Sequence, residues 1–151
     1  MDPGALGSLG VGTGFSMAAK LAHPNKEVVC LYGDGSFGMT AFDMETAQRF
    51  GAPYIAIVGN NSAMNQIRYG QISKYGAQRG GVGNKLGDVD FSLFGKMIGG
   101  YGEEVREASQ IQPALLRARE AIAKTGKCAV VNVWVDPNEY APGTKAQTMY
   151  K

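Results

Sequence analysis

The chain has 151 residues, of which 44% are hydrophobic and 19% charged, and it carries a formal net charge of +2. This length suits one compact domain, and this composition is typical of a soluble globular protein and argues against a disordered one. The chain has no run of Lys or Arg and no apolar stretch near the ~20 residues of a membrane span, which argues against nucleic-acid and membrane partners. We therefore expect a single cytoplasmic domain over residues 1–151.

The first half of the chain alternates helical and strand patterns. A helix is expected over residues 15–21, and His23-Pro24-Asn25 breaks it. Residues 27–32 (EVVCLY) and 54–58 (YIAIV) are short apolar runs rich in β-branched residues, which predict buried strands. Between them a helix is expected over residues 40–50, where Thr40 can cap the start and Gly51 can end it.

The second half continues this alternation after a less regular stretch. Residues 65–75 predict a helix or mixed structure, and the glycine-rich residues 76–90 predict an exposed loop. Buried-type strands that alternate with helices predict an α/β fold, with a doubly wound, mostly parallel sheet and helices on both faces. In it we expect Cys30 and Cys128 to be buried, reduced thiols. The remaining elements expected are helices over 91–98 and 110–123, strands over 102–106 and 128–135, and a polar tail over 136–151.

Polar residues end the two neighbouring strands of the first half. Asp34 follows the first strand between two glycines, and Asn60-Asn61 follows the next strand, about one β-α-β unit later. Open α/β sheets bind ligands at the carboxyl ends of their strands, so we expect these side chains to meet. A carboxylate, a carboxamide, the close N–H groups at Gly33 and Gly35 and the hydroxyl of Ser36 suit a diphosphate bound with Mg²⁺.

Two other phosphate-binding patterns fail here. The chain contains no G-x-x-x-x-G-K-[ST] sequence, so a P-loop is excluded. The glycines of residues 7–14 (GSLGVGTG) are only loosely like a dinucleotide fingerprint, because no strand precedes them in this chain.

Two stretches carry a more specific resemblance. GDGSFGMTAFDMETAQRFGAPYIAIVGNNSAMNQ (33–66) resembles the G-D-G … N-N thiamine diphosphate motif of acetolactate synthases, pyruvate oxidases, oxalyl-CoA decarboxylases and 2-hydroxyacyl-CoA lyases. GALGSLGVGTGFSMAA (4–19) resembles the segment that those enzymes place beneath the thiamine. The chain therefore resembles the C-terminal thiamine diphosphate-binding domain of this family, and we expect it to be part of a larger enzyme.

The resemblance implies a site for thiamine diphosphate and Mg²⁺. Leu9 stands where many relatives have a methionine wedged between the two cofactor rings, and the carbonyl of Gly7 would accept a hydrogen bond from the 4′-amino group. Asp34, Asn61 and the carbonyl of Ala63 would be the protein ligands of Mg²⁺. The cofactor contacts implied are Gly7, Ser8, Leu9, Gly33, Gly35, Ser36, Met64 and Asn65.

The family also uses a glutamate that activates the aminopyrimidine ring of the cofactor, and that residue lies in a separate pyrimidine-binding domain. No glutamate of this chain stands in the expected sequence context, so we expect no catalytic residue here and no activity of the chain alone. The pyrimidine-binding domain would belong to the same polypeptide or to a separate subunit, and the resemblance implies a homodimer or homotetramer. The glutamates considered are Glu27, Glu45, Glu103, Glu104, Glu107, Glu120 and Glu139.

Several reactions fit the resemblance. Residues 62–70 and the tail resemble 2-hydroxyacyl-CoA lyases and oxalyl-CoA decarboxylases more than they resemble true acetolactate synthases. This resemblance implies a 2-oxo, 2-hydroxyacyl or acyl-CoA substrate. A tyrosine common in oxalyl-CoA decarboxylases is absent near Asn65, which favours carbon–carbon cleavage or ligation. An acetolactate synthase-like domain and a cofactor-binding subunit without turnover are the alternatives. The tail, residues 136–151, is a candidate lid in which Thr144, Lys145 or Gln147 meets substrate.

Overall fold

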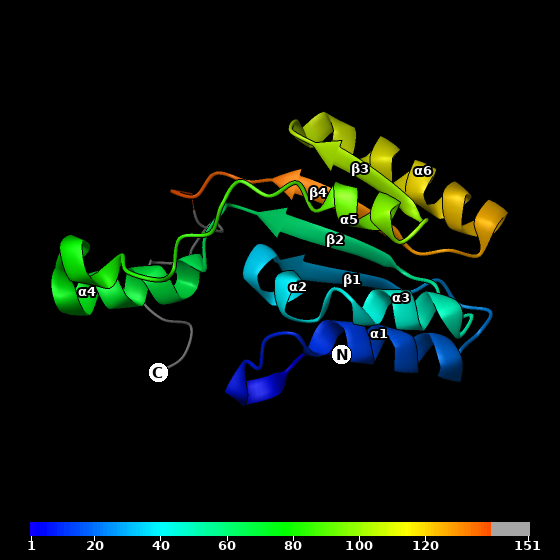
Figure 1. Cartoon of the computed structure of the whole chain (residues 1–151), viewed down its shortest axis with the longest axis horizontal. Helices are drawn as coiled ribbons and strands as arrows, with labels where there is room; N and C mark the ends of the chain where they lie inside the picture. Colours follow the sequence, from blue (N-terminus) through cyan, green and yellow to red (C-terminus); the bar gives the residue numbers. More distant parts are fainter. Residues whose placement is uncertain (140–151) are drawn as a thin grey trace.

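The protein is built on one sheet of four parallel strands (Figure 1). The computed structural model describes residues 1–139. The spatial order of the strands is β1-β2-β4-β3, and β1 pairs with β2 in register from Val29 and Ile55 to Gly33 and Gly59. Both strands therefore end at the same edge of the sheet, as predicted. The strands are β1 (Val29–Gly33), β2 (Ile55–Asn60), β3 (Tyr101–Val105) and β4 (Ala129–Trp134).

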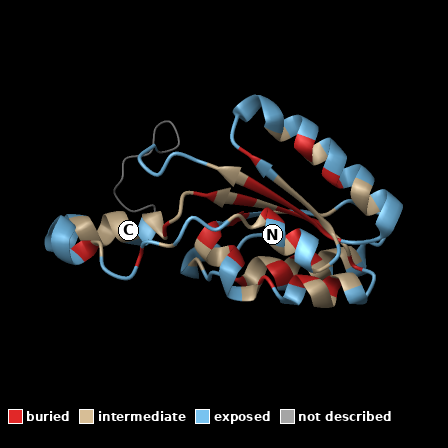
Figure 2. Cartoon of the chain, turned by 45° about the horizontal axis from the view of Figure 1, so that its top comes forward, coloured by how far each residue is buried: buried red, intermediate tan, exposed pale blue. Residues whose placement is uncertain are grey.

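Helices cover both faces of the sheet, which confirms the predicted α/β class (Figures 1 and 2). One core cluster joins Tyr32 and Val58 of the sheet to Phe37 and Met44 of two helices on one face. On the other face a smaller cluster packs Ala114 and Ala118 of a single long helix against the sheet. The helices are η1 (Gly4–Leu6), α1 (Val11–Ala22), α2 (Asp34–Thr40), α3 (Asp43–Arg49), α4 (Asn65–Gly80), α5 (Ser92–Met97) and α6 (Ala108–Thr125).

α6 covers only part of its face. It packs against β3 and β4, at the far side of the sheet from β1. Val29 and Leu31 of β1 point to the uncovered part and are 54% and 77% exposed. The prediction that residues 27–32 form a buried strand is therefore wrong for one of its two faces, because no described helix covers β1 there.

The first helix after β1 also differs from the prediction. The sequence predicts one helix over residues 40–50, which α3 confirms in part, but α2 already begins at Asp34 and has Thr40 as its last residue. Phe37 explains the difference, since it is fully buried with edge-on contacts to the rings of Tyr32, Phe91 and Phe94. This packing outweighs the cost of helical glycine, about 1 kcal/mol relative to alanine at each position.

α4 runs longer than predicted and extends away from the sheet (Figure 1). The expected loop over 76–90 begins only after Gly80. The helix is kinked at Gly76, which has φ +78°, and the chain after it folds back so closely that a Cβ at Gly80 would clash with the backbone of Ile72. Asn84 holds this return by donating hydrogen bonds to the Gln71 side chain at 2.7 Å and to the Gly80 carbonyl at 2.6 Å.

Both cysteines are free thiols, as predicted. Cys128 is buried, but Cys30 is only half-buried because it belongs to the edge strand β1. Within residues 1–139, no helix is both long and apolar enough to cross a membrane. The predicted lid residues Thr144, Lys145 and Gln147 lie outside the described residues.

Candidate functional site

The carboxylate of Asp34 joins the ends of β1 and β2. Asp34 is 4% exposed, and its Oδ1 accepts a hydrogen bond from the N–H of Gly35 at 2.7 Å. Its Oδ2 accepts from the N–H groups of Asn61 and Ala63, both at 3.1 Å. The three residues for which the sequence predicts a common metal ion therefore lie together. A carboxylate has about four acceptor sites, so these three hydrogen bonds leave room for a further ligand.

Asn61 brings a second oxygen to this place. Its Oδ1 is buried and has no hydrogen-bond partner among the described residues. A buried oxygen without a partner loses its solvation, at a cost of about 1–3 kcal/mol. The next residue, Ser62, has φ +54°, a left-handed conformation that is uncommon for residues other than glycine. A strained turn and an orphaned oxygen at one strand end point to a ligand that the chain is shaped to hold.

The segment after α4 clamps this turn. Ser62 donates its hydroxyl hydrogen to Asp88 Oδ1 at 2.6 Å, and its carbonyl accepts from the N–H of Leu86 at 2.7 Å. Met64 N–H donates to the carbonyl of Asn84 at 2.9 Å, so the two segments form a short antiparallel bridge. These contacts of residues 84–88 could not be predicted from the sequence, because a glycine-rich composition indicates a loop but not which segment the loop contacts.

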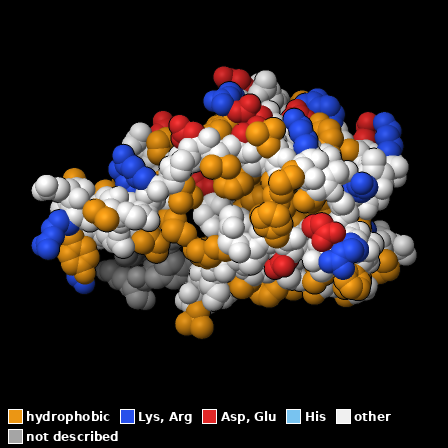
Figure 3. All heavy atoms as spheres, viewed as in Figure 1, with side chains coloured by type: hydrophobic (Ala, Val, Ile, Leu, Met, Phe, Trp, Pro, Cys, Tyr) orange, Lys and Arg blue, Asp and Glu red, His pale blue; other side chains and the backbone are white. Residues whose placement is uncertain are grey.

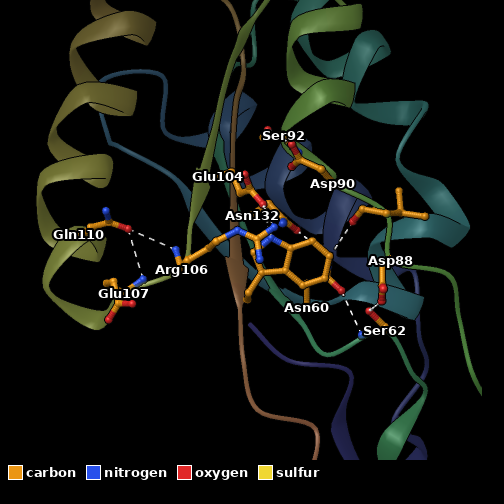
Figure 4. A network of polar contacts seen from close by, with 12 residues as sticks. Asn60, Ser62, Asp88, Asp90, Ser92, Glu104, Arg106, Glu107, Gln110 and Asn132 are labelled. Atoms are coloured by element: carbon orange, nitrogen blue, oxygen red, sulfur yellow. Dashed lines mark hydrogen bonds and ion pairs between the residues drawn. The ribbon is translucent and has the colours of Figure 1, made fainter.

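A buried pair of asparagines fixes the end of β2 from the other side (Figure 4). Asn60 and Asn132 are both fully buried, and Asn60 Nδ2 donates to Asn132 Oδ1 at 3.0 Å and to the carbonyl of Val89 at 2.7 Å. Asn60 Oδ1 in turn accepts from the N–H of Ser62 at 3.1 Å. The strained turn is therefore tied to the centre of the sheet as well as to the segment after α4.

A cleft of about 790 Å³ opens beside these strand ends. Its volume is within the range of small-molecule sites. The α4 residues Gln66, Lys74 and Tyr75 form one wall, and Leu6 and Leu9 of the N-terminal segment line it as well. Ser8, also a predicted contact, lines the neighbouring hollow between α1 and β1 instead. The predicted residues that line the cleft are Gly7, Leu9, Gly33, Asp34, Gly35, Ser36, Asn61, Ala63, Met64 and Asn65.

The electrostatics of the cleft suit an anion with a cation beside it. α4 begins at Asn65 and turns its unpaired N–H groups and positive dipole end toward the cleft, where Lys74 adds a positive charge. Asp34 is the acidic residue of the cleft lining. Elsewhere, on the face seen in Figure 3, basic and acidic side chains are interspersed, except at the end that carries α4, where only basic ones are seen.

The side chains of this site could not complete the coordination of a metal ion by themselves. No cluster of three or more His, Cys, Asp or Glu residues that could hold a metal occurs within residues 1–139. Asp34 and Asn61 supply two hard oxygens, and Mg²⁺ is usually bound by one or two carboxylates together with phosphate oxygens and water. The residues present therefore fit Mg²⁺ shared with a bound diphosphate.

Comparison with known proteins identifies the family. The model of the thiamine pyrophosphate enzyme C-terminal TPP-binding domain matches residues 1–133. The chain belongs to this family. Thiamine pyrophosphate, or TPP, is the same compound as thiamine diphosphate.

Similar proteins include both lyases and synthases. This TPP-binding domain is 34% identical to 2-hydroxyacyl-CoA lyase 2 of Mus musculus over 145 residues, which is 95% of this chain and 22% of the relative. It is 35% identical to the 2-hydroxyacyl-CoA lyase 2 of Danio rerio over 146 residues, 95% of this chain and 23% of the relative. It is also 34% identical to the acetolactate synthase large subunit IlvG of Mycobacterium tuberculosis over 142 residues, 94% of this chain and 25% of the relative. The chain thus spans a quarter or less of the length of these proteins.

Proposed function

We propose that this TPP-binding domain holds the diphosphate of its cofactor through a Mg²⁺ ion bound by Asp34, Asn61 and the carbonyl of Ala63. The observation that carries the proposal is the orphaned Oδ1 of Asn61, a residue whose backbone N–H binds the buried Asp34 carboxylate. A cation at this point would satisfy the amide oxygen and balance the charge of the carboxylate. The diphosphate would lie against Gly33, Gly35 and Ser36, and on its far side against the first turn of α4.

The thiamine end of the cofactor would contact the N-terminal segment. Gly7, Ser8 and Leu9 lead from η1 into α1, and Leu9 is 48% exposed beside the cleft. An aliphatic side chain there can serve as a wedge that keeps the two rings of the cofactor bent toward each other. When bound, the cofactor would supply an electron sink for the carbanion that forms at the former carbonyl carbon of the substrate.

The reaction we propose for the complete enzyme is cleavage or ligation of a carbon–carbon bond, of the type catalysed by 2-hydroxyacyl-CoA lyases. Identities of 34% and 35% to two 2-hydroxyacyl-CoA lyases support it. Where oxalyl-CoA decarboxylases commonly carry a tyrosine, Asn65 donates its amide hydrogen to the carbonyl of Pro137 at 2.8 Å, so the position links α4 to the residues after β4. An acetolactate synthase-like reaction is the second candidate, because a synthase subunit is 34% identical.

The activating carboxylate must come from another domain under this proposal. All seven glutamates of the chain fall within residues 1–139, and none of them lines the cleft. Several have cationic partners away from it, such as Arg49 for Glu45 and Arg117 for Glu103. A pyrimidine-binding domain, of the same polypeptide or a partner subunit in a dimer or tetramer, would supply that group.

Calorimetric titration of the purified chain with thiamine diphosphate, with and without Mg²⁺, tests the metal assignment. We expect Mg²⁺-dependent binding that weakens about a hundredfold or more in Asp34→Ala, because the variant removes both a ligand and the anchor of the metal-binding turn. Asp43→Ala is the matched control, since Asp43 lies in the first turn of α3 and outside the cleft. Unchanged affinity in Asp34→Ala would overturn the metal site.

A further inference from the structure

Four hydroxyl groups form a continuous hydrogen-bonded chain from the core to the backbone of Gly10. Thr40 Oγ1 lies 2.7 Å from the Gly10 carbonyl oxygen, and Thr13 Oγ1 lies 3.1 Å from Thr40 Oγ1. The Tyr32 hydroxyl lies 3.2 Å from Thr13 Oγ1 and 3.1 Å from the hydroxyl of Tyr54. Thr13, Tyr32 and Tyr54 are 1%, 4% and 0% exposed, so water does not compete for these groups.

The carbonyl at the end sets the direction of every hydrogen bond in this chain. A carbonyl oxygen only accepts, so Thr40 uses its single hydroxyl hydrogen on Gly10. Thr13 must then donate to Thr40, Tyr32 to Thr13, and Tyr54 to Tyr32. Burial raises the pKa of Tyr54 to about 12 and raises the pKa of Tyr32 as well, so both phenols keep the hydrogens that this order requires. Hydrogen bonds aligned in one direction strengthen one another.

Gly10 connects the two parts of the candidate site. Its N–H donates to Ser36 Oγ at 3.0 Å, which leaves the hydroxyl hydrogen of Ser36 to donate to a diphosphate oxygen. Gly10 has φ +80°, and a Cβ there would lie 3.1 Å from Thr40 Cγ2 and 3.3 Å from Met39 Cβ. Glycine is thus needed both for the backbone conformation and for the close approach of α2. Directly before it come Gly7, Ser8 and Leu9.

We propose that Thr40 is a positioning residue for thiamine binding, which fixes the Gly10 carbonyl and so sets the Gly7–Leu9 segment relative to Ser36. The proposal rests on the proposed function, in which Gly7–Leu9 contacts the thiamine rings and Ser36 contacts the diphosphate. Buried tyrosines could satisfy each other within the core, and core packing would need only the methyl group of Thr40. The hydroxyl of Thr40 instead donates the last hydrogen bond of the series to the backbone carbonyl of Gly10, directly after Gly7–Leu9.

Hydrogen exchange of the 151-residue chain tests the positioning without any ligand. Thr40→Val keeps the shape and removes the donor, Thr40→Ser keeps the donor, and Tyr54→Phe removes only the hydroxyl farthest from Gly10. We expect exchange of amides 4–10 to be about tenfold faster in Thr40→Val and close to wild type in the other two variants. Equal exchange of amides 4–10 in Thr40→Val and wild type would overturn the proposal. So would acceleration spread over the whole chain in both Thr40→Val and Tyr54→Phe.

Titration with two ligands then separates positioning from a general structural role. We expect Thr40→Val to weaken Mg²⁺-dependent thiamine diphosphate binding about tenfold, but inorganic pyrophosphate binding less than about twofold, because Asp34 and Ser36 are unchanged. Thr40→Ser should restore thiamine diphosphate affinity. An equal loss of affinity for both ligands would overturn the proposal that Thr40 positions the Gly7–Leu9 segment. A wild-type chain that bound neither ligand would count against the proposed function, while the exchange comparison would still decide the role of Thr40.

Discussion

β1 and β2 are adjacent parallel strands with similar apolar sequences, yet they are buried to different extents. In β2, Ala56 and Val58 are fully buried, and Ile55 is 7% exposed. In β1, Leu31 is 77% exposed, whereas its in-register partner Ile57 in β2 is half-buried. The strands differ in position, since β2 lies between two strands and β1 lies at the edge, beyond the reach of α6.

The two strands differ in burial along their length, but their carboxyl ends are similar. Each strand ends on a polar residue that is held by main-chain hydrogen bonds, Asp34 after β1 and Asn60 at the end of β2. Burial of a strand body depends on which helices reach it, but the meeting of strand ends depends only on parallel pairing. The site can therefore form next to a strand that is half exposed.

The largest expected effect is at the centre of the sheet. Val58→Ala removes two methyl groups from a fully buried position in β2. We expect the free energy of unfolding of the chain to fall by about 2–3 kcal/mol, from lost burial and the cavity left behind. Urea denaturation measures it. A loss below about 1 kcal/mol would mean that β2 is less tightly packed than the structure indicates.

The two cysteines should differ in how they affect the pH dependence of the free energy of unfolding. Burial raises the pKa of the Cys128 thiol from 9.0 to about 11, and the thiol lies 3.6 Å from the carbonyl of Met44. The folded state favours the neutral thiol, so this stability is fully present below pH 9 and is lost as the pH rises toward 11. We expect Cys128 alone to lower the free energy of unfolding by about 1 kcal/mol between pH 8 and pH 10.

Variants in which one cysteine is replaced show which thiol causes the loss of stability at alkaline pH. Cys128→Ala should remove about 1 kcal/mol of the loss between pH 8 and pH 10, measured by urea denaturation at each pH. The part that comes from the buried phenols Tyr32 and Tyr54, whose pKa values are also raised, should remain. Cys30→Ala, in the edge strand, is the matched control and should keep the wild-type dependence. The same alkaline loss in Cys128→Ala as in wild type would show that another group controls stability in this range.

The smallest expected effect is on the bare face of β1. Leu31→Lys replaces a side chain that is 77% exposed, so we expect the free energy of unfolding to change by less than about 0.5 kcal/mol. Thermal and urea unfolding of the 151-residue chain measure it. Destabilisation as large as that of Val58→Ala would show that Leu31 is covered in solution by a second copy of the chain, and the unfolding midpoint would then depend on protein concentration.

The alternation of strands and helices could be predicted from the sequence, because short β-branched runs between glycine- and proline-containing breaks are a local signal. The placement of Asp34 beside Asn61 follows from the same pattern, since parallel strands must end at one edge, whereas Ala63 was implied only by the resemblance. The resemblance over residues 4–19 and 33–66 added the cofactor, and the family match over residues 1–133 confirms the TPP-binding domain.

Other features depend on contacts between distant parts of the chain, and only the tertiary structure decided them. α2 begins at Asp34 because Phe37 finds a pocket of rings from α5 and the residue before it, which no local propensity predicts. The clamp of Asp88 on Ser62 joins residues in a glycine-rich segment to a strand end far away in sequence. The burial of an apolar strand likewise depends on neighbours in space, and so does the choice of the hydroxyl that reaches the Gly10 carbonyl. The sequence by itself determined the order of the helices and strands and the polar residues at the strand ends.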